Sequence, residues 1–529
     1  MSQILNRRRF LQASAAAAAS VGVSTIRTSA ISADEYVEAI VIGSGFGGAV
    51  ASLRLGQAGI ETIVLERGRR WQINDAGDTF STTDKPDGRS TWLSSTTILP
   101  SLAPPFPIDV YTGVLDVKRG NGINAYQGAG VGGTSLVYGG ISYQPTEELF
   151  YKVFPRTINY ARLDRIYYPR VRSILKASPI PDDILQTKYY LASRILQEQA
   201  AKAGLKSRKI DIAFDWDIVR QEIAGQKVAS IIAGQVYYGA NSGAKNSVDR
   251  NYLRMAEETG YVKIRPLHVV NTIGESDRGG YRVVCNQINE QGEVVVQKSF
   301  ACRYLFLAAG SIGTTELLLR AKTNGTLRRL NDQVGKFWGT NSDSTTVMIN
   351  AGETNPTQGT PGVISIDHLD NPIAPLILEP FQAIPFTPQG LLPVLGQAIS
   401  KPEGYLTYNT ATQSADLFWP SNSLDSQKNA QALQYTFQRL NDANGTSLAA
   451  PPDYSNTAHP LGGAVVGRVC NPFGQVLGYP NLFVVDGSFI PGSTACSNPS
   501  LTIAALAEQS MDHLLNRIPG RRRKIYSPF

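Results

Sequence analysis

The sequence predicts an α/β fold built from two large domains, and three observations support this prediction. The chain has 529 residues, which is more than a single hydrophobic core usually organises. Apolar residues make up 42% of it and charged residues 18%, a balance that allows extensive burial and is typical of a globular protein. Residues 37–66 read as a strand, a glycine-rich turn, a helix and a second strand. This β-turn-α-β unit places the chain in the α/β class.

The β-turn-α-β unit follows from the residue types in each of its parts. Residues 37–42 are apolar and β-branched, and this run stops at the glycines of residues 43–48. Residues 49–58 carry apolar side chains at helical spacing. Residues 61–65 form a second apolar run, which ends in Glu66. We therefore expect two strands joined by one helix.

The turn carries a G-x-G-x-x-G motif, which in this context predicts a Rossmann-type dinucleotide site. Gly43 makes the tight turn, Gly45 lets the backbone approach a pyrophosphate, and Gly48 lets helix and strand pack closely. The free N–H groups of the helix N-terminus bind the diphosphate. Glu66 is placed to accept hydrogen bonds from a ribose diol, which argues against NADP. The predicted contacts are Gly43, Gly45, Phe46, Gly47, Gly48 and Glu66.

Three further segments carry a resemblance. Residues 127–140 contain six glycines, which predicts backbone packed closely against a neighbour. Together with His-Pro-Leu-Gly-Gly at residues 459–463 and Asn-Leu-Phe-Val-Val-Asp-Gly-Ser at residues 481–488, the run at residues 125–135 resembles the glucose-methanol-choline (GMC) family of FAD oxidoreductases. Within that family it looks like the cholesterol oxidase branch, with similarity from about residue 36 to about residue 515.

The resemblance implies that the dinucleotide is FAD, bound non-covalently. One residue departs from the family pattern, because Tyr138 stands where members usually carry an Asn, so one polar contact near the flavin differs. The further FAD-binding residues implied by the resemblance are Gly130, Gly132, Gly133, Ser135, Asp486, Gly487 and Asn498.

Glu379 lies in an apolar run, where a carboxylate must be solvated, paired or raised in pKa. A surface position for Glu379 stays open on the sequence alone. The resemblance implies that Glu379 moves a proton during double-bond isomerisation, while His459 and Asn498 hold the substrate hydroxyl. For Asn498 the alternative is a capping role, since Asn498-Pro499 opens a predicted helix at residues 500–508.

The reaction implied by the resemblance is oxidation of an alcohol, most like the 3β-hydroxyl of a sterol, with O2 reduced to H2O2. A 5-ene to 4-ene isomerisation would follow. One alternative is a GMC dehydrogenase that acts on another alcohol with a quinone or carrier as acceptor. Another is a non-catalytic flavin- or lipid-binding protein. We expect a monomer that takes its substrate from a membrane surface.

The FAD-binding domain should be assembled from residues 36–75, 245–335 and 475–515, and the substrate-binding domain, with a mainly antiparallel sheet and helices, from residues 76–244 and 336–474. Residues 69–116 are rich in Gly, Pro, Ser and Thr and predict a loop, either a lid or a surface excursion. A hairpin turning at residues 290–292 would place Cys285 opposite residue 296, out of register with Cys302. We expect no disulfide framework and no metal.

The first 33 residues read as a twin-arginine signal peptide, which predicts export to the periplasm or secretion. Arg7 and Arg8 belong to the arginine run, and the alanine-rich residues 13–23 are too few to span a bilayer. The formal net charge of +7 arises largely from this segment and from the basic cluster at residues 521–524, within a predicted C-terminal tail at residues 516–529. The rest is nearly neutral, so we expect no nucleic-acid partner.

Overall fold

The computed structural model describes residues 35–98, 105–355, 357–360, 362–381 and 390–518. The predicted signal peptide at residues 1–33 and the basic cluster at residues 521–524 lie outside the described residues. Across the described ranges, no helix combines the length and the apolar character that a membrane crossing requires.

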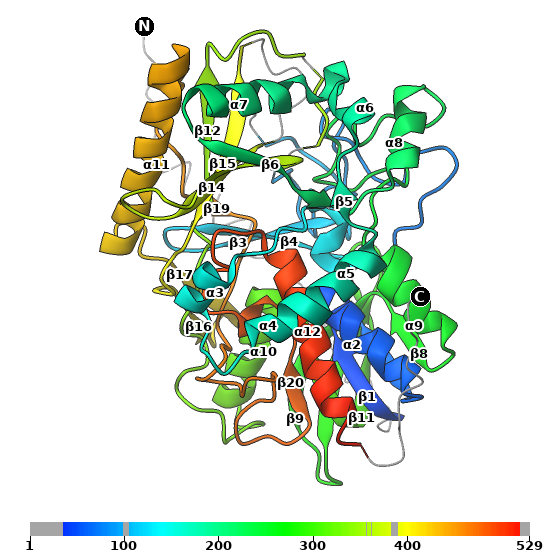
Figure 1. Ribbon diagram of the computed structural model, residues 1–529. Helices are drawn as coiled ribbons and strands as arrows, with labels where there is room; N and C mark the ends of the chain where they lie inside the picture. Colours follow the sequence, from blue (N-terminus) through cyan, green and yellow to red (C-terminus); the bar gives the residue numbers. More distant parts are fainter. Residues whose placement is uncertain (1–34, 99–104, 356, 361, 382–389, 519–529) are drawn as a thin grey trace, which may run out of the picture.

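A seven-stranded sheet forms the lower part of the molecule in Figure 1. Strand order is β8–β2–β1–β11–β10–β9, and β20 pairs with β11. Strands β8, β2, β1, β11 and β20 run parallel to one another. Strand β10 pairs antiparallel with β11 on one side and with β9 on the other. In chain order the bounds are β1 (Glu35–Ile42), β2 (Thr62–Leu65), β8 (Val262–Arg265), β9 (His268–Glu275), β10 (Tyr281–Ile288), β11 (Val294–Leu307) and β20 (Leu482–Val484).

Three helices pack on this parallel sheet. Helix α2 (Phe46–Gln57) follows β1, and α10 (Gly310–Thr323) follows β11. Helix α12 (Pro499–Leu515), far away in the sequence, lies beside α2 (Figure 1). The second half of β1, residues 39–42, is apolar and mostly β-branched, and it is buried on both faces, as expected for a parallel strand covered by helices.

The hairpin of β10 and β11 differs from the sequence prediction in its register. Cys285 lies opposite Lys298, whereas residue 296 was predicted. A bulge between Gln287 and Ile288, which sets two residues of one strand against one of the other, accounts for one of these two positions. The turn itself accounts for the other, because Ile288 lies opposite Val294. Cys302 lies opposite Tyr281, and all four cysteines are free and buried.

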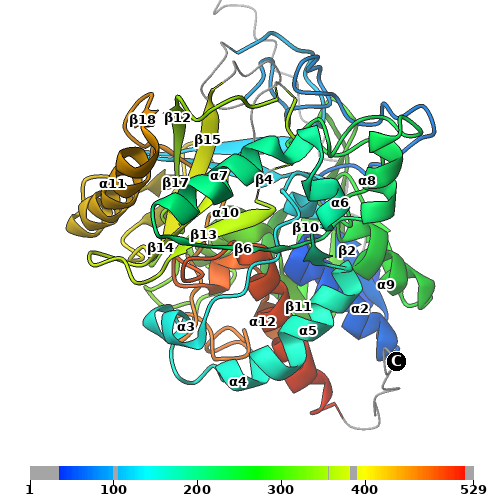
Figure 2. The ribbon, with the colours of Figure 1, turned by 45° about the horizontal axis from the view of Figure 1, so that its top comes forward.

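A six-stranded antiparallel sheet forms the other half of the molecule, in the order β18–β12–β15–β14–β13–β6. Helices α7 (Leu191–Lys202) and α11 (Leu424–Asn444) contact each other, and α7 packs on β6, β13 and β14 (Figure 2). The strands are β6 (Lys206–Lys209), β12 (Ser344–Ile349), β13 (Ile364–His368), β14 (Leu376–Pro380), β15 (Leu392–Ala398) and β18 (Ser447–Leu448). The predicted α/β fold with a mainly antiparallel second sheet is thus confirmed.

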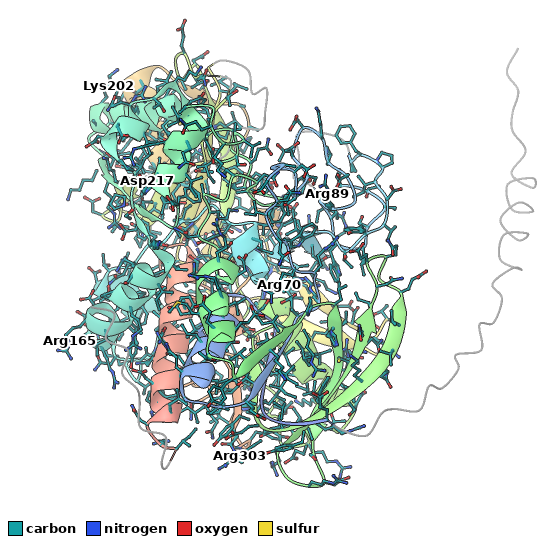
Figure 3. The ribbon with its side chains drawn as sticks, turned by 90° about the vertical axis from the view of Figure 1, so that its right-hand side faces the viewer. Arg70, Arg89, Arg165, Lys202, Asp217 and Arg303 are labelled. Carbon is teal, nitrogen blue, oxygen red and sulfur yellow. The ribbon has the colours of Figure 1, made fainter. Side chains whose placement is uncertain are left out.

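The two sheets have separate hydrophobic cores and extend in opposite directions. In Figure 3, Lys202 on α7 and Arg303 on β11 mark the two ends of the molecule. Between them lies a small sheet of β3 (Leu115–Arg119), β4 (Asn124–Gly128) and β19 (Asn456–Thr457).

One segment packs differently from the predicted division of the chain. Helices α3 (Glu147–Val153) and α5 (Tyr168–Leu175) were grouped with the substrate-binding domain. The buried side chains of α5 join the core of the parallel sheet, whereas α3 contributes Phe150 to that core and Leu149 to the core of the antiparallel sheet. The reason is contact with α12, where the hydroxyls of Tyr168 and Thr502 lie 3.2 Å apart. The remaining elements are α4 (Tyr160–Arg162), β5 (Ser178–Pro179), α6 (Asp182–Leu185), β7 (Asp211–Ile212), α8 (Trp216–Ile223), α9 (Arg254–Glu258), β16 (Tyr405–Asn409) and β17 (Ser414–Phe418).

Candidate active site

The glycine turn between β1 and α2 has the close packing that its motif predicts. Gly43 has a φ of 94°, and a β-carbon there would collide with the Ala308 carbonyl. A β-carbon on Gly48 would collide with the Gly43 carbonyl. Gly45 differs, because a β-carbon there would meet nothing nearer than the Gly133 Cα, at 4.0 Å. The backbone at Gly45 therefore faces free space of the kind a phosphate group needs.

The N-terminus of α2 suits an anion. Gly45 is the N-cap residue, no side chain caps the helix, and its first turn contains no acidic residue. The first N–H groups of such a helix lack intrahelical partners and carry the positive end of the helix dipole. A diphosphate fits this position, so the residues present are compatible with a dinucleotide.

Ser44 ties the predicted nucleotide-binding segments together, although sequence reasoning did not single it out. The Glu66 carboxylate, 4% exposed, accepts hydrogen bonds from Ser44 N (3.0 Å), Ser44 Oγ (2.6 Å) and Gly68 N (2.9 Å). Ser44 Oγ in turn accepts one from Gly132 N at 3.0 Å. A carboxylate has about four acceptor positions. Glu66 could therefore accept hydrogen bonds from a ribose while it keeps those from Ser44.

The second glycine run lies directly against the first. A β-carbon on Gly133 would come within 2.7 Å of the Gly45 Cα. Ser135, which was predicted to bind FAD, holds its own loop through its hydroxyl, because Oγ donates to Gly132 O at 2.6 Å and accepts from Val248 N at 3.0 Å. The ring of Tyr138 packs edge-on against Phe46 at 5.2 Å between centroids.

The Asp486 side chain forms hydrogen bonds within the protein. Its buried carboxylate accepts hydrogen bonds from Gly310 N (2.8 Å), Thr314 Oγ1 (2.5 Å), Ser488 N (2.9 Å) and Ser488 Oγ (2.5 Å). A contact from Asp486 to a cofactor would therefore come from its backbone. Gly487 O accepts from Gly462 N at 2.9 Å, which joins this segment to the His-Pro-Leu-Gly-Gly motif.

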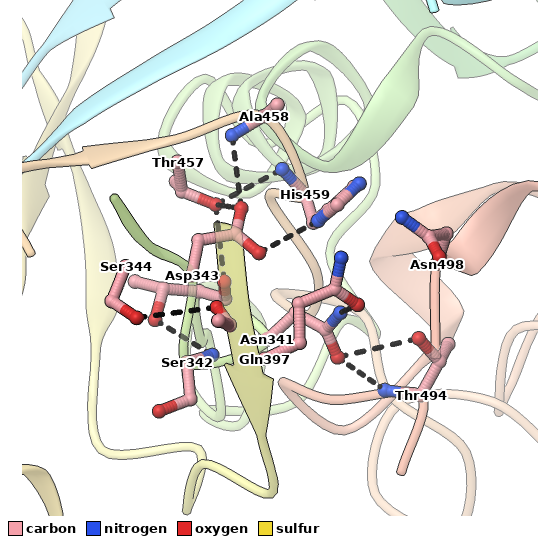
Figure 4. Close-up of polar contacts among 12 residues, drawn as sticks. Asn341, Ser342, Asp343, Ser344, Gln397, Thr457, Ala458, His459, Thr494 and Asn498 are labelled. Carbon is pink, nitrogen blue, oxygen red and sulfur yellow. Dashed lines mark hydrogen bonds and ion pairs between the residues drawn. The ribbon is translucent and has the colours of Figure 1, made fainter. Parts of the chain in front are cut away.

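His459 forms the first half of the candidate catalytic group (Figure 4). Its Nδ1 lies 2.7 Å from Asp343 Oδ1, and the second carboxylate oxygen accepts from Thr457 Oγ1 (2.8 Å) and Ala458 N (3.1 Å). The carboxylate thus holds the proton on Nδ1 and leaves Nε2 as an acceptor. In Figure 4 the far edge of the ring points away from Asp343, toward the side where Asn498 lies.

Glu379 and Asn498 form the second half. Glu379 lies on β14 and is 1% exposed, which excludes the surface position that the sequence left open. Its Oε2 accepts from Asn498 Nδ2 at 3.3 Å and from Gln397 Nε2 at 3.5 Å. Burial raises the pKa of Glu379 to about 8, with a smaller opposing effect from the Asn498 hydrogen bond.

Asn498 occupies the N-cap position of α12, but its side chain makes no capping hydrogen bond. Its amide points to Glu379 instead, so the capping role that the sequence offered is not used. Two polar atoms in this pair, Glu379 Oε1 and Asn498 Oδ1, are buried without a hydrogen-bond partner among the described residues. Buried polar atoms are rarely left unpaired, and here they lie where a substrate or cofactor group could pair with them.

Two tight turns position these groups. Asn341 and Ser342 precede Asp343 with φ values of 57° and 55°, and Ala495 and Cys496 lie before Asn498 with φ values of 64° and 57°. Left-handed conformations of such residues store strain, commonly at functional sites.

The Asn341 side chain holds both turns together. It donates to Ser497 O at 2.8 Å and accepts from Thr494 N at 2.9 Å.

Sequence reasoning missed Asp343, Gln397 and Asn341. A signal was available for Asp343, because residues 340–346 form an uninterrupted polar run, which is unusual before a buried strand. Gln397 stands in the apolar strand β15 as Glu379 stands in β14. Isolated polar residues on two paired strands indicate a polar contact inside the sheet.

Comparison with known proteins agrees with this architecture. Residues 401–507 match the family model described as GMC oxidoreductase, for its C-terminal domain. A cholesterol oxidase of Mycobacterium tuberculosis is 26% identical over 565 aligned residues, which cover 92% of this chain and 92% of that protein. A cholesterol oxidase of Acinetobacter baumannii is 24% identical over 549 residues, covering 90% and 94%.

The crystal structure of pyridoxine 4-oxidase from Mesorbium loti has the same fold, with a TM-score of 0.63 and 12% identity over 91% of this chain and 100% of that chain. The C-terminal segment is thus similar to the GMC oxidoreductase family, most of the chain is similar to two cholesterol oxidases, and the fold is that of a pyridoxine 4-oxidase.

Proposed function

We propose that this protein is an FAD-dependent alcohol oxidase that converts the 3β-hydroxyl of a sterol to a ketone and then moves the 5-ene double bond to the 4-ene position. The relatives named cholesterol oxidase, which match nine-tenths of the chain, support the substrate class. The observation that carries the proposal is that one site contains both His459, oriented by a carboxylate, and Glu379, a buried glutamate with a raised pKa.

His459 handles the hydroxyl proton. Its Nε2 is the free acceptor, because Asp343 fixes the proton on Nδ1 and stabilises the imidazolium that forms. The alcohol hydroxyl donates to Nε2 and loses its proton there as the carbonyl forms.

The FAD supplies the acceptor for the hydride that leaves the carbinol carbon. Gly45 and the α2 N-terminus would hold its diphosphate, Glu66 its ribose, and the segments at Gly133 and Asn498 its ring end. Asn498 orients the hydroxyl by donating to its oxygen from the second N–H of Nδ2, since the first is directed at Glu379.

Glu379 handles the carbon-bound proton of the second step. A carboxyl group with a pKa of about 8 exchanges protons near neutral pH far more readily than one at its ordinary value. Its unpaired Oε1 is the atom that accepts a proton from C4 of the 3-keto-5-ene steroid and returns it at C6. Surrounding apolar strands exclude water, which would otherwise exchange with this proton.

The test is anaerobic mixing of purified FAD-bound protein with cholesterol, followed by admission of O2. We expect the flavin absorption to bleach with cholesterol, to recover with O2, and to yield peroxide and the ultraviolet absorption of a conjugated enone. The control is His459→Ala, which should slow the bleaching about 10²- to 10⁴-fold.

Three other results would contradict the cofactor, the substrate or the electron acceptor. Protein that stays colourless with ample FAD contradicts the cofactor. Bleaching by other alcohols but not by cholesterol contradicts the substrate. Bleaching without recovery in O2 identifies a dehydrogenase that uses another acceptor.

A further inference from the structure

Lys245 is a buried lysine that the reaction described above does not use. The residue is 3% exposed, and its ammonium donates to Leu136 O at 2.8 Å and to Val236 O at 3.0 Å. An ammonium has three N–H groups, so one remains without a partner among the described residues. Within the described ranges, no carboxylate lies at ion-pair distance from Lys245. A cation buried in this way requires a reason, because desolvation strongly disfavours it.

The lysine lies directly behind the second glycine loop. Leu136, which accepts one of its hydrogen bonds, ends the 3-10 turn that begins at Gly133, beside Gly45. The ammonium also lies 5.8 Å from the ring centroid of Tyr138, within the range of a cation–π contact. Tyr138 is the residue that departs from the family pattern, and its hydroxyl is buried without a partner among the described residues.

The charges around Lys245 do not neutralise it. The charge of Asp249 raises the pKa of Lys245, but this effect is smaller than that of burial, and Asp249 Oδ1 is buried without a hydrogen-bond partner in the described structure. Arg250 and Arg70 influence Asp249 in turn. Burial lowers the pKa of Lys245 to about 7, so that the ammonium is charged below neutral pH and responds to any negative charge placed beside its loop.

We propose that Lys245 is a positioning and electrostatic residue that stabilises negative charge on the isoalloxazine ring from behind the loop of residues 133–138. This inference rests on the proposed function, since it requires a bound flavin. The positive charge acts through a low-dielectric layer made of Leu136 and Tyr138, where charges interact more strongly than in water. A lysine that served only to join the Leu136 and Val236 carbonyls could be replaced by a neutral donor without consequence for the flavin.

The experiment is a sulfite titration of the flavin-bound protein at pH 6, where Lys245 is protonated. The sulfur lone pair of sulfite forms a bond to flavin N5, and the displaced electron pair remains on the ring as negative charge, so nothing else is consumed. Lys245→Met should weaken sulfite binding at least about tenfold, because it removes one buried charge close to the ring. Lys245→Gln keeps donors for the two carbonyls and lacks the charge, so it should weaken binding to a similar extent.

Arg250→Met is the matched control. Arg250 belongs to the same segment and also bonds backbone carbonyls, but it is partly exposed and screened by solvent. We expect sulfite affinity within about twofold of wild type for this variant. Wild-type affinity in Lys245→Gln, or an equal loss in Arg250→Met, overturns the inference. Colourless wild-type protein contradicts the proposed function instead, so the two failures are distinguishable.

Discussion

Two buried glutamates of this protein, Glu379 and Glu508, lie in opposite electrostatic surroundings. Glu508, on α12, is fully buried, and its oxygens bind Arg54 (2.6 Å) and Arg170 (2.9 Å) together with the hydroxyl of Tyr252 (3.1 Å). Glu379 is equally buried but contacts only two neutral amides at 3.3 and 3.5 Å, and in the described structure no cation lies at ion-pair distance.

The comparison shows how one protein assigns similar carboxyl groups to stability and to chemistry. The charge of Glu508 holds α12 against α2 and α5, since its two arginines come from those helices. Glu379 has a raised pKa because it lacks such partners, and a raised pKa is what proton exchange near pH 7 requires. Asn498, at the start of the helix that carries Glu508, supplies one of the few polar contacts of Glu379.

The largest effect should come from Glu379→Gln, which preserves volume and removes the exchangeable proton. We expect isomerisation to fall about 10²- to 10⁴-fold, while flavin reduction by a sterol changes much less. The protein would release the 3-keto-5-ene product, and the ultraviolet absorption of the conjugated enone would be missing. Stopped-flow recording of flavin and product absorption measures both steps. Conjugated enone formed at the wild-type rate would remove Glu379 from the reaction.

Glu508→Gln should reduce stability and leave the chemistry intact. It leaves Arg54 and Arg170, whose side chains are 15% and 24% exposed, without their carboxylate, which should cost about 3 kcal/mol in the free energy of unfolding. The folded enzyme should still produce conjugated enone. Denaturant unfolding measures the loss.

The control for Glu508 is Glu148→Gln. The Glu148 ion pair with Lys152 is exposed at 80% and 47%, and its loss should change stability by less than about 0.5 kcal/mol. Equal destabilisation by both variants would contradict the structural role of Glu508.

The pH dependence of stability should separate wild-type protein from Glu379→Gln. The folded-state pKa of Glu379 is about 8, above its ordinary value of 4.5, so its contribution to stability is present at low pH and is lost as the pH rises toward 8. The Gln variant lacks this loss. Its free energy of unfolding, relative to wild type, should therefore increase by about 3 kcal/mol between about pH 5 and about pH 8. A difference that stays constant over this range would mean that Glu379 ionises with an ordinary pKa.

Local patterns predicted the fold better than the site. The β-turn-α-β unit at residues 37–66 depends on neighbouring residues alone, and the structure has β1, α2 and β2 there. The site depends on contacts between distant segments. Asp343 pairs with His459 across 116 positions, and no pattern around either residue names the other. The burial of Glu379 likewise results from the pairing of β14 with β13 and β15, so its sequence neighbours left two alternatives open.

The same limit explains the register of the β10–β11 hairpin and the position of α5. A one-residue bulge at Gln287 and Ile288 has no distinctive residue type, yet it changes every pair beyond it. Helix α5 joins the parallel-sheet core through α12, more than 300 residues away in the chain.

The smallest effect should come from the N-cap of α12, where a local rule and a distant contact compete. Asn before Pro at a helix start predicts capping, and loss of a cap typically costs about 1 kcal/mol. The Asn498 side chain makes no such bond, because its amide turns to Glu379 119 positions away. Asn498→Ala should therefore change stability by less than about 0.5 kcal/mol.

The matched control is Ser423→Ala in α11. Ser423 Oγ accepts from Ser426 N at 3.2 Å and does cap its helix, so this variant should lose about 1 kcal/mol. Asn498→Ala should instead alter the chemistry, because the Asn498 hydrogen bond lowers the pKa of Glu379 and its loss should move the pH midpoint of isomerisation upward. Denaturant unfolding of both variants and the pH profile of enone formation make the two measurements. If Asn498→Ala loses as much stability as Ser423→Ala and keeps the wild-type pH midpoint, Asn498 is a helix cap and the contact with Glu379 has no role in the reaction.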